Sequence, residues 1–204
     1  MKTLRILLAE DVAMVRGALV ALIELEPDLK VVADVESGDE IVPAAQEHQP
    51  DIAIIDINLR GLDGLSAASQ LHEKLPSCRI LILTHLSRAG MLRRALAAHV
   101  SGYMFKDAPP EQLAAAIRDI AAGNRVIDMQ LAVSAWEAGE NPLSPRELEV
   151  LRLVAEGAEP GEIAVALHLS VGTVRNYVTA IVTKLEARNR VDAIKTAYDA
   201  GWLP

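Results

Sequence analysis

The chain has 204 residues, of which 51% are hydrophobic and 24% charged, and this composition excludes a disordered protein. No apolar run approaches the roughly 18 residues of a membrane span, and no export signal is visible, so we expect a cytoplasmic protein without membrane insertion. A single cysteine, Cys78, cannot form an intrachain disulfide, which fits a reducing compartment. The net charge of −8 argues against a surface coated in basic residues for nucleic acid.

This charge is unevenly distributed along the chain. Turn and breaker residues between Gly123 and Pro142 predict a linker with a short helix at 123–142, which joins a first domain at 1–122 to a second at 143–204. Residues 1–142 carry a net charge of −7 and residues 143–204 a net charge of −1, and segment 170–195 carries +3. The acidity therefore belongs to the first half, and a basic segment lies near the end of the chain.

Short apolar runs alternate with helical patterns in the first domain. Five runs have the composition of strands buried on both faces: Leu4–Ala9, Leu29–Val35, Ile52–Asp56, Arg79–Thr84 and Gly102–Phe105. Helical patterns follow them, the later four at about Gly38–His48, Gly64–Leu75, Ser87–His99 and Pro110–Ala122. This alternation predicts an α/β fold, a five-stranded doubly wound parallel sheet whose ligands bind at the carboxyl ends of the strands.

Polar residues end or directly follow several of these runs: Glu10, Asp11, Asp56, Thr84 and Lys106. Three carboxylates meeting at one edge would raise one another's pKa values unless a cation joins them. Mg²⁺ prefers a few carboxylates together with waters and a phosphate oxygen. A carboxylate beside Mg²⁺, a lysine and a hydroxyl can accept a phosphoryl group, because the cations neutralise the transferred charge.

These residues, with Gly61-Leu62-Asp63-Gly64 and Gly102-Tyr103-Met104-Phe105-Lys106, resemble the receiver domain of two-component response regulators over residues 1–122. The resemblance implies that Asp56 is the phosphoacceptor and that Lys106 pairs with the phosphoryl oxygens. It implies a Mg²⁺ site formed by Asp11, Asp56, the Asn58 carbonyl and, through water, Glu10. It also implies that Thr84 moves toward the phosphate and lets Tyr103 turn inward as the switch residue.

Two positions depart from the receiver pattern. Arg60 stands where this family usually has proline, and we expect only a minor change in the loop. His85 follows Thr84, where receivers usually carry a small residue that borders the path of the phosphoryl group. The larger side chain could slow phosphotransfer or hydrolysis, or it could simply point to solvent.

The sequence of the second domain predicts helices throughout. Ser144 and Glu147 form a capping box around Pro145, and helices are expected at about Pro145–Ala155, Pro160–Leu167, Gly172–Leu185 and Arg190–Ala200. Two short helices joined by a three-residue turn, the second of them basic, form a helix-turn-helix pattern. In the third helix the core stripe is Val174, Val178, Ile181 and Leu185. Arg175, Asn176 and Thr179 lie off it, and arginine and asparagine suit guanine and adenine in the major groove.

Several sequence segments of this domain resemble the four-helix LuxR-type DNA-binding domain. The combination of such a domain with a receiver defines the NarL/FixJ group. The segments are residues 143–151, Glu162-Ile163-Ala164, Leu169-Ser170, 172–177 and Lys184-Leu185. The resemblance implies that Arg175, Asn176 and Thr179 read bases, and that Thr173, Tyr177, Lys184 and Arg188 approach phosphates.

A charge of +3 is modest, so two protomers on paired half-sites are expected. The last helix offers one dimer face through Val191, Ile194 and Ala197, although this stripe could instead pack within its own domain. The receiver offers another through its first and fifth helices, with Leu113, Ala116, Ile117 and Ile120 available.

The sequence therefore predicts a transcription regulator, not an enzyme, that a sensor histidine kinase phosphorylates and that then binds double-stranded promoter DNA as a homodimer. RNA polymerase is a further candidate partner. Residues 14–19, 172–177 and 201–203 resemble the branch that controls lipid-desaturase genes. Two alternatives are a pseudo-receiver that acts without phosphate and an aspartate-nucleophile phosphatase, although Asn58 replaces the second carboxylate that such enzymes usually need. The sequence contains no G-x-x-x-x-G-K-[ST] motif, so we expect no ATP-driven activator domain.

Overall fold

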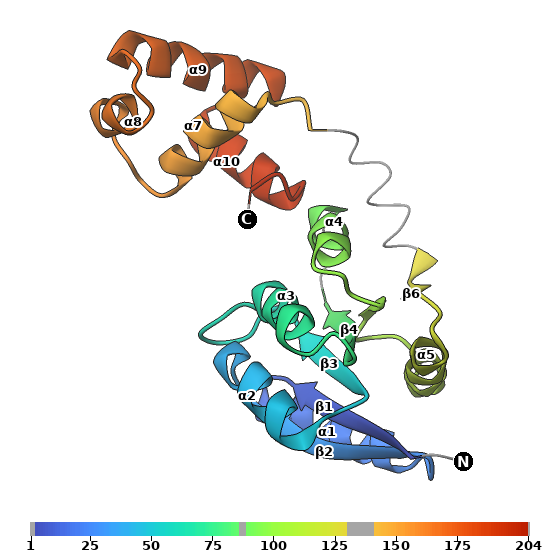
Figure 1. The fold of residues 1–204 in the computed structure, drawn as a ribbon. Coiled ribbons are helices and arrows are strands. Elements are labelled where there is room, and N and C mark those ends of the chain that lie inside the picture. Colours follow the sequence, from blue (N-terminus) through green and yellow to red (C-terminus); the bar gives the residue numbers. More distant parts are fainter. Residues whose placement is uncertain (1–2, 86–88, 130–140, 204) are drawn as a thin grey trace. The chain divides into compact units, whose positions relative to one another are not determined.

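A computed structural model describes residues 3–85, 89–129 and 141–203 of the chain (Figure 1). The chain divides into two compact units, one built on a sheet in the first two thirds and one built on four helices after residue 140. Across the described residues, no single helix has the length and apolarity needed to cross a membrane, although Pro160–Ala166 and Val171–Lys184 meet this test as a pair bent by 106°.

The first unit contains a parallel sheet with the strand order β2-β1-β3-β4-β5-β6. The bounds are β1 Leu4–Ala9, β2 Leu29–Val35, β3 Ile52–Asp56, β4 Arg79–Thr84, β5 Gly102–Phe105 and β6 Val126–Ile127. The first five strands confirm the predicted parallel sheet. The sixth was not predicted, because two residues form no detectable apolar run, and it lies in the segment that was expected to be linker. All strands run in the same direction, so their carboxyl ends share one edge of the sheet.

Five helices accompany the sheet: α1 Ala13–Glu24, α2 Gly38–His48, α3 Gly64–Lys74, α4 Ala89–Ala97 and α5 Pro110–Ala122. Side chains alternate across a strand, and every second residue of β1, β3 and β4 packs with α1 and α5 in one apolar core. Helices α2 and α3 pack against each other (Figure 1). Pro43 lies inside α2, and the capping box of Ser37 and Glu40 stabilises the start of that helix.

One expectation about α5 is wrong. Leu113, Ala116, Ile117 and Ile120 were expected to be available for a dimer interface, but all four are buried in the core beneath α5. The helix has one apolar stripe, and the sheet covers it. Exposed apolar side chains near α5 include Leu22 in α1 and Leu25 directly after it. They border a groove with a volume of about 130 Å³ between α1 and α5.

The second unit consists of α7 Pro145–Ala155, α8 Pro160–Ala166, α9 Val171–Lys184 and α10 Arg190–Asp199. Three of these helices have N-cap side chains that accept hydrogen bonds from backbone N–H groups of the first turn: Ser144, Ser170 and Asn189. These caps stabilise the helix starts. The four helices enclose a separate apolar core. The short helix expected within 123–142 falls mainly on residues 130–140, outside the described part of the chain.

The apolar stripe of α10 serves its own domain in part. Ala197 is fully buried and Ile194 packs against the core, whereas Val191 is 67% exposed. The stripe therefore packs within its own domain through Ile194 and Ala197, and Val191, in the first turn, is the residue of the stripe left with exposed apolar surface.

Candidate functional site

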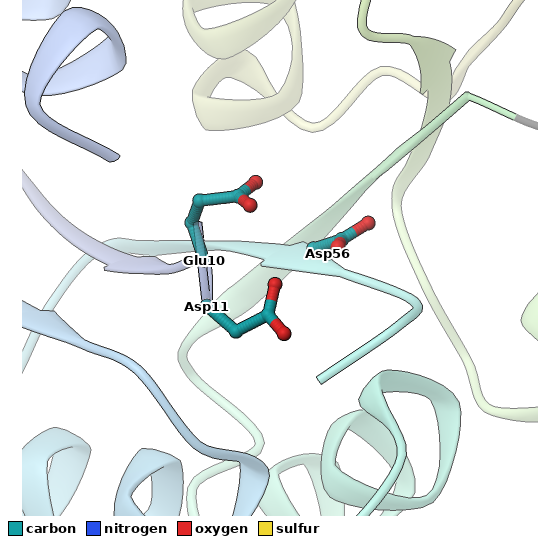
Figure 2. Close-up of side chains that lie close together, drawn as sticks. All are labelled: Glu10, Asp11 and Asp56. Atoms are coloured by element: carbon teal, nitrogen blue, oxygen red, sulfur yellow. The ribbon is translucent and has the colours of Figure 1, made fainter. Parts of the chain in front are cut away.

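Three carboxylates meet at the carboxyl edge of the sheet. Glu10 and Asp11 directly follow β1, Asp56 ends the neighbouring strand β3, and Figure 2 shows their side chains grouped at this edge. One oxygen of each carboxylate lies within 4.8 Å of the others. Glu10 and Asp56 are buried and Asp11 is partly exposed, so the cluster opens to solvent on the Asp11 side.

Lys106 follows β5 and completes the cluster. Its Nζ lies 2.5 Å from Glu10 Oε2 and 3.0 Å from Asp56 Oδ2, and its side chain is almost fully buried. A hydrogen bond from the Lys106 N–H to the Thr84 carbonyl fixes the backbone at this point. The sequence placed Lys106 at this edge but did not reveal its pairing with Glu10, since no local spacing connects two residues 96 positions apart.

The second oxygen of Asp56 is available for a ligand. Asp56 Oδ1 is buried and has no hydrogen-bond partner among the described residues, which is uncommon for a carboxylate in a folded protein. The candidate metal ligands of this cluster are all oxygens of acidic side chains, which suits a hard divalent cation. Asn58, two residues beyond Asp56, lies in the loop after β3 with its side chain exposed.

Thr84 and Tyr103 connect this edge to the interior. Thr84 ends β4, Tyr103 lies on the adjacent strand β5, and both side chains are buried. Burial raises the pKa of Tyr103 to about 12, with a smaller opposing contribution from Thr84, so the phenol stays neutral at physiological pH. Tyr103 thus occupies the inward position in this structure, and His85, next to Thr84, is exposed.

Helix α9 carries the residues predicted to read bases. Val174 and Ile181 are buried in the core, while Arg175, Asn176 and Thr179 are exposed on the other side of the helix. The Thr179 hydroxyl donates a hydrogen bond of 3.0 Å to the Arg175 carbonyl, so it is partly engaged with its own helix. Arginine and asparagine therefore supply the free hydrogen-bonding groups of this face.

The residues predicted to approach phosphates all have contacts inside the domain. The Thr173 hydroxyl lies 2.8 Å from Ser170 Oγ, and Tyr177 packs against the core. Lys184 Nζ lies 2.8 Å from Glu147 Oε2, and Arg188 forms two hydrogen bonds of 3.0 Å with the Asp192 carboxylate. The i, i+4 spacing of Arg188 and Asp192 could indicate their ion pair from the sequence, whereas no such spacing connects Lys184 with Glu147.

Glu147 links the capping box of α7 to α9. It accepts a hydrogen bond from the Ser144 N–H at 2.7 Å in addition to the ion pair with Lys184. Burial acts to raise the pKa of Glu147, but the hydrogen bonds from Lys184 and Ser144 outweigh it and hold the pKa below its ordinary value.

Comparisons with known proteins now identify the family. Residues 6–118 match the response regulator receiver domain, and residues 141–197 match the LuxR family of bacterial regulatory proteins. The chain is a response regulator of the NarL/FixJ family. This response regulator is 43% identical over 198 residues to the transcriptional regulatory protein DesR of Bacillus subtilis, covering 97% of the chain and 98% of DesR. It is 31% identical to the response regulator protein VraR of Staphylococcus aureus, over 96% of the chain and 97% of VraR.

Solved structures share the fold of the response regulator. RcsB from Salmonella enterica serovar Typhimurium, solved bound to a promoter, aligns with a TM-score of 0.74 at 24% identity, over 97% of this chain and 99% of RcsB. The response regulator ChrA of a heme-sensing two-component system aligns with a TM-score of 0.61 at 27% identity, over 99% of this chain and all of ChrA. With its receiver and LuxR-type domains, the chain is a DNA-binding transcription regulator and not a phosphatase.

Proposed function

We propose that phosphorylation of Asp56 by a sensor histidine kinase switches this regulator into a dimer that binds promoter DNA. The observation that carries the proposal is Asp56 itself, whose Oδ1 is buried without a partner among the described residues while Oδ2 faces Lys106. A pseudo-receiver that acts without phosphate has no need for a buried carboxylate oxygen that lacks a hydrogen-bond partner.

The chemistry is a phosphoryl transfer to a carboxylate. An oxygen of Asp56 forms a bond to phosphorus as the bond between phosphorus and the histidine nitrogen of the kinase breaks, and the imidazole leaves with the electron pair. The Lys106 ammonium, 3.0 Å from Asp56 Oδ2, neutralises charge that develops on the transferred group. Glu10, Asp11, Asp56 and the Asn58 carbonyl would hold Mg²⁺, which supplies further charge neutralisation when bound.

The proposed switch runs from Asp56 through Thr84 and Tyr103. A phosphoryl group adds nearly two negative charges, and Thr84, at the end of the adjacent strand, would donate its hydroxyl to a phosphoryl oxygen. Tyr103 lies on β5, which pairs with that strand, and its side chain already points inward in this structure. Phosphorylation would stabilise this inward position further and so shift a pre-existing equilibrium. A homodimer then brings two α9 helices to paired half-sites.

The dimer has two candidate faces in the described residues. Leu22 and Leu25 lie beside the groove between α1 and α5, and Val191 lies at the start of α10. On DNA, Arg175, Asn176 and Thr179 would contact bases, and Thr173, Tyr177, Lys184 and Arg188 would lie toward phosphates. RNA polymerase is a further proposed partner, and the cytoplasm is the proposed location.

The proposed target genes include those for lipid desaturases. Residues 14–19, 172–177 and 201–203 resemble the branch with that role, and the 43% identity with DesR along almost the whole chain accords with it. Transcript levels of desaturase genes in a strain lacking the regulator would test this assignment.

Phosphate-affinity gels and DNA mobility shifts with acetyl phosphate test the switch. We expect wild-type protein to gain one phosphoryl group and bind promoter DNA more tightly, and Asp56→Asn to do neither. Asp107→Asn, which removes an exposed carboxylate close to Lys106, should behave as wild type. Phosphorylation that persists in Asp56→Asn, or equal DNA affinity with and without acetyl phosphate, would refute the proposal and favour the pseudo-receiver.

A further inference from the structure

Arg60 occupies a loop whose backbone is held in place. The loop connects β3 to α3, and Arg60 forms a bridge with Ser37, just before α2. The Gly38 N–H donates to the Arg60 carbonyl at 3.1 Å, and the Leu62 N–H donates to Asp39 Oδ2 at 3.2 Å. The start of α2 therefore holds the loop backbone at Arg60 and at Leu62, on the side of Arg60 that leads to α3.

Two glycines allow the start of α2 and this loop to approach closely. A Cβ at Gly38 would lie 1.9 Å from the Leu62 carbonyl oxygen, and a Cβ at Gly61 would lie 1.9 Å from Asp39 Oδ2. Gly61 also has a φ of +68°, which glycine adopts readily. The backbone that follows Arg60 therefore has little room to move, and this restricts the direction in which the Arg60 side chain leaves the loop.

That side chain reaches the one carboxylate of the cluster for which Lys106 shows no ion pair within the described residues. Arg60 Nη2 donates to the Asp11 carbonyl at 3.1 Å, and Arg60 Nε lies 3.9 Å from Asp11 Oδ2. Lys106 pairs with Glu10 and Asp56. Two cations of the chain thus neutralise most of the charge of three carboxylates.

We propose that Arg60 is a positioning residue that competes with the divalent cation for Asp11 and so sets the cation concentration at which Asp56 can be phosphorylated. The inference rests on the proposed function, because it concerns the same acidic cluster. A cation bound at Asp11 Oδ2 would take the place of the Arg60 guanidinium, and one bound at the other oxygen would still lie close to that positive charge. Proline, the usual residue here in receivers, has no charge and cannot compete, so the replacement is more than a minor change in the loop.

The competition is expected to be modest. The Arg60 side chain is 65% exposed, and exposed ion pairs contribute little because water and salt screen them. We therefore expect Arg60→Gln to tighten Mg²⁺ binding by about threefold or more at low salt, and the difference to shrink at high salt as the Debye length falls.

Mg²⁺ titrations of the full chain, followed by NMR of backbone amides near Asp56, test the inference without measuring phosphorylation. Arg60→Lys keeps the charge and should stay within about twofold of wild type. Arg125→Gln removes an equal charge just before β6, at the opposite edge of the sheet, and should leave the affinity unchanged. Thermal unfolding of each variant checks that the fold is retained.

The outcomes separate this inference from the proposed function. Wild-type protein that binds Mg²⁺ with the same affinity as Arg60→Gln overturns the role of Arg60 and leaves the phosphoacceptor site intact. Arg60→Lys that tightens binding as much as Arg60→Gln overturns charge competition as the cause. Wild-type protein that binds no Mg²⁺ overturns the metal site and the role of Arg60 together.

Discussion

The two units of this response regulator treat their charged residues in opposite ways. In the receiver, Glu10, Asp56 and Lys106 are buried together, and the ion pairs among them form the site itself. In the DNA-binding unit, Arg175 and Asn176 are exposed, and the nearby basic residues Lys184 and Arg188 are paired with acids of the same unit. A chemical site needs a fixed, partly dehydrated arrangement, whereas a reading surface must leave its donors free for a partner.

The largest expected effect concerns the reading surface. Arg175→Ala combined with Asn176→Ala removes the two exposed donors of α9 and should reduce the preference for operator over random DNA by at least about 30-fold, since each bidentate base contact is worth about 1–3 kcal/mol. Mobility shifts with specific and random duplexes measure this ratio. Retained operator preference would refute the assignment of both residues.

The next prediction tests the buried acid of the DNA-binding unit. Glu147→Gln removes the charge that Lys184 and the Ser144 N–H contact and should lower the free energy of unfolding of this unit by about 1–3 kcal/mol. Because the folded-state pKa of Glu147 lies below its ordinary value of 4.5, its charge stabilises the fold above that pH, and the contribution is lost as pH falls through the folded-state pKa. The difference between wild type and Glu147→Gln should therefore shrink below about pH 4.5.

Calorimetry of the full chain between pH 3.5 and pH 7 gives this comparison, with Glu149→Gln as the matched control. Glu149 lies on the same helix and pairs with Arg146 at the surface, so its loss should change stability by less than about 1 kcal/mol. Equal effects of the two substitutions at neutral pH would show that burial of Glu147 adds nothing.

The contrast between the units also explains which features the sequence reveals. The strands end at polar residues, and the helices begin at Ser37, Asp63, Ser144 and Ser170, so local chemistry fixes most of the element bounds. The acidic cluster could be predicted because parallel strands bring their carboxyl ends to one edge. β6 could not, since two residues carry no periodicity.

Side-chain pairing was harder to predict than placement. The stripe of Leu113, Ala116, Ile117 and Ile120 is the same whether α5 faces the sheet or a second protomer, and only the packed core shows that the sheet takes it. The pairing of Arg60 with Asp11 joins residues 49 positions apart, and that of Lys184 with Glu147 joins residues 37 apart. Such contacts depend on how elements pack in three dimensions, and no sequence period encodes them.

A smaller effect is expected at the mouth of the receiver site. His85 is exposed beside the buried Thr84, at the position where receivers usually carry a small residue bordering the path of the phosphoryl group. His85→Ala should change the rate of phosphorylation or dephosphorylation by about twofold to fivefold, which is about 0.4–1 kcal/mol of activation free energy. Rates measured with acetyl phosphate, and decay rates of the phosphorylated protein, check this. Unchanged rates in both directions would leave His85 as a solvent-facing residue.

The smallest effect is expected at Arg188, and it sharpens the contrast between free and paired cations. Arg188 is paired with Asp192, and a phosphate would compete with this ion pair, so Arg188→Ala should reduce the slope of log affinity against log salt by less than about 1. Asp192→Asn keeps the side-chain shape but removes the competing charge, and it should raise affinity for random DNA by about twofold to fourfold. A full unit of slope lost in Arg188→Ala, with no gain in Asp192→Asn, would mean that the ion pair does not hold Arg188 back from DNA.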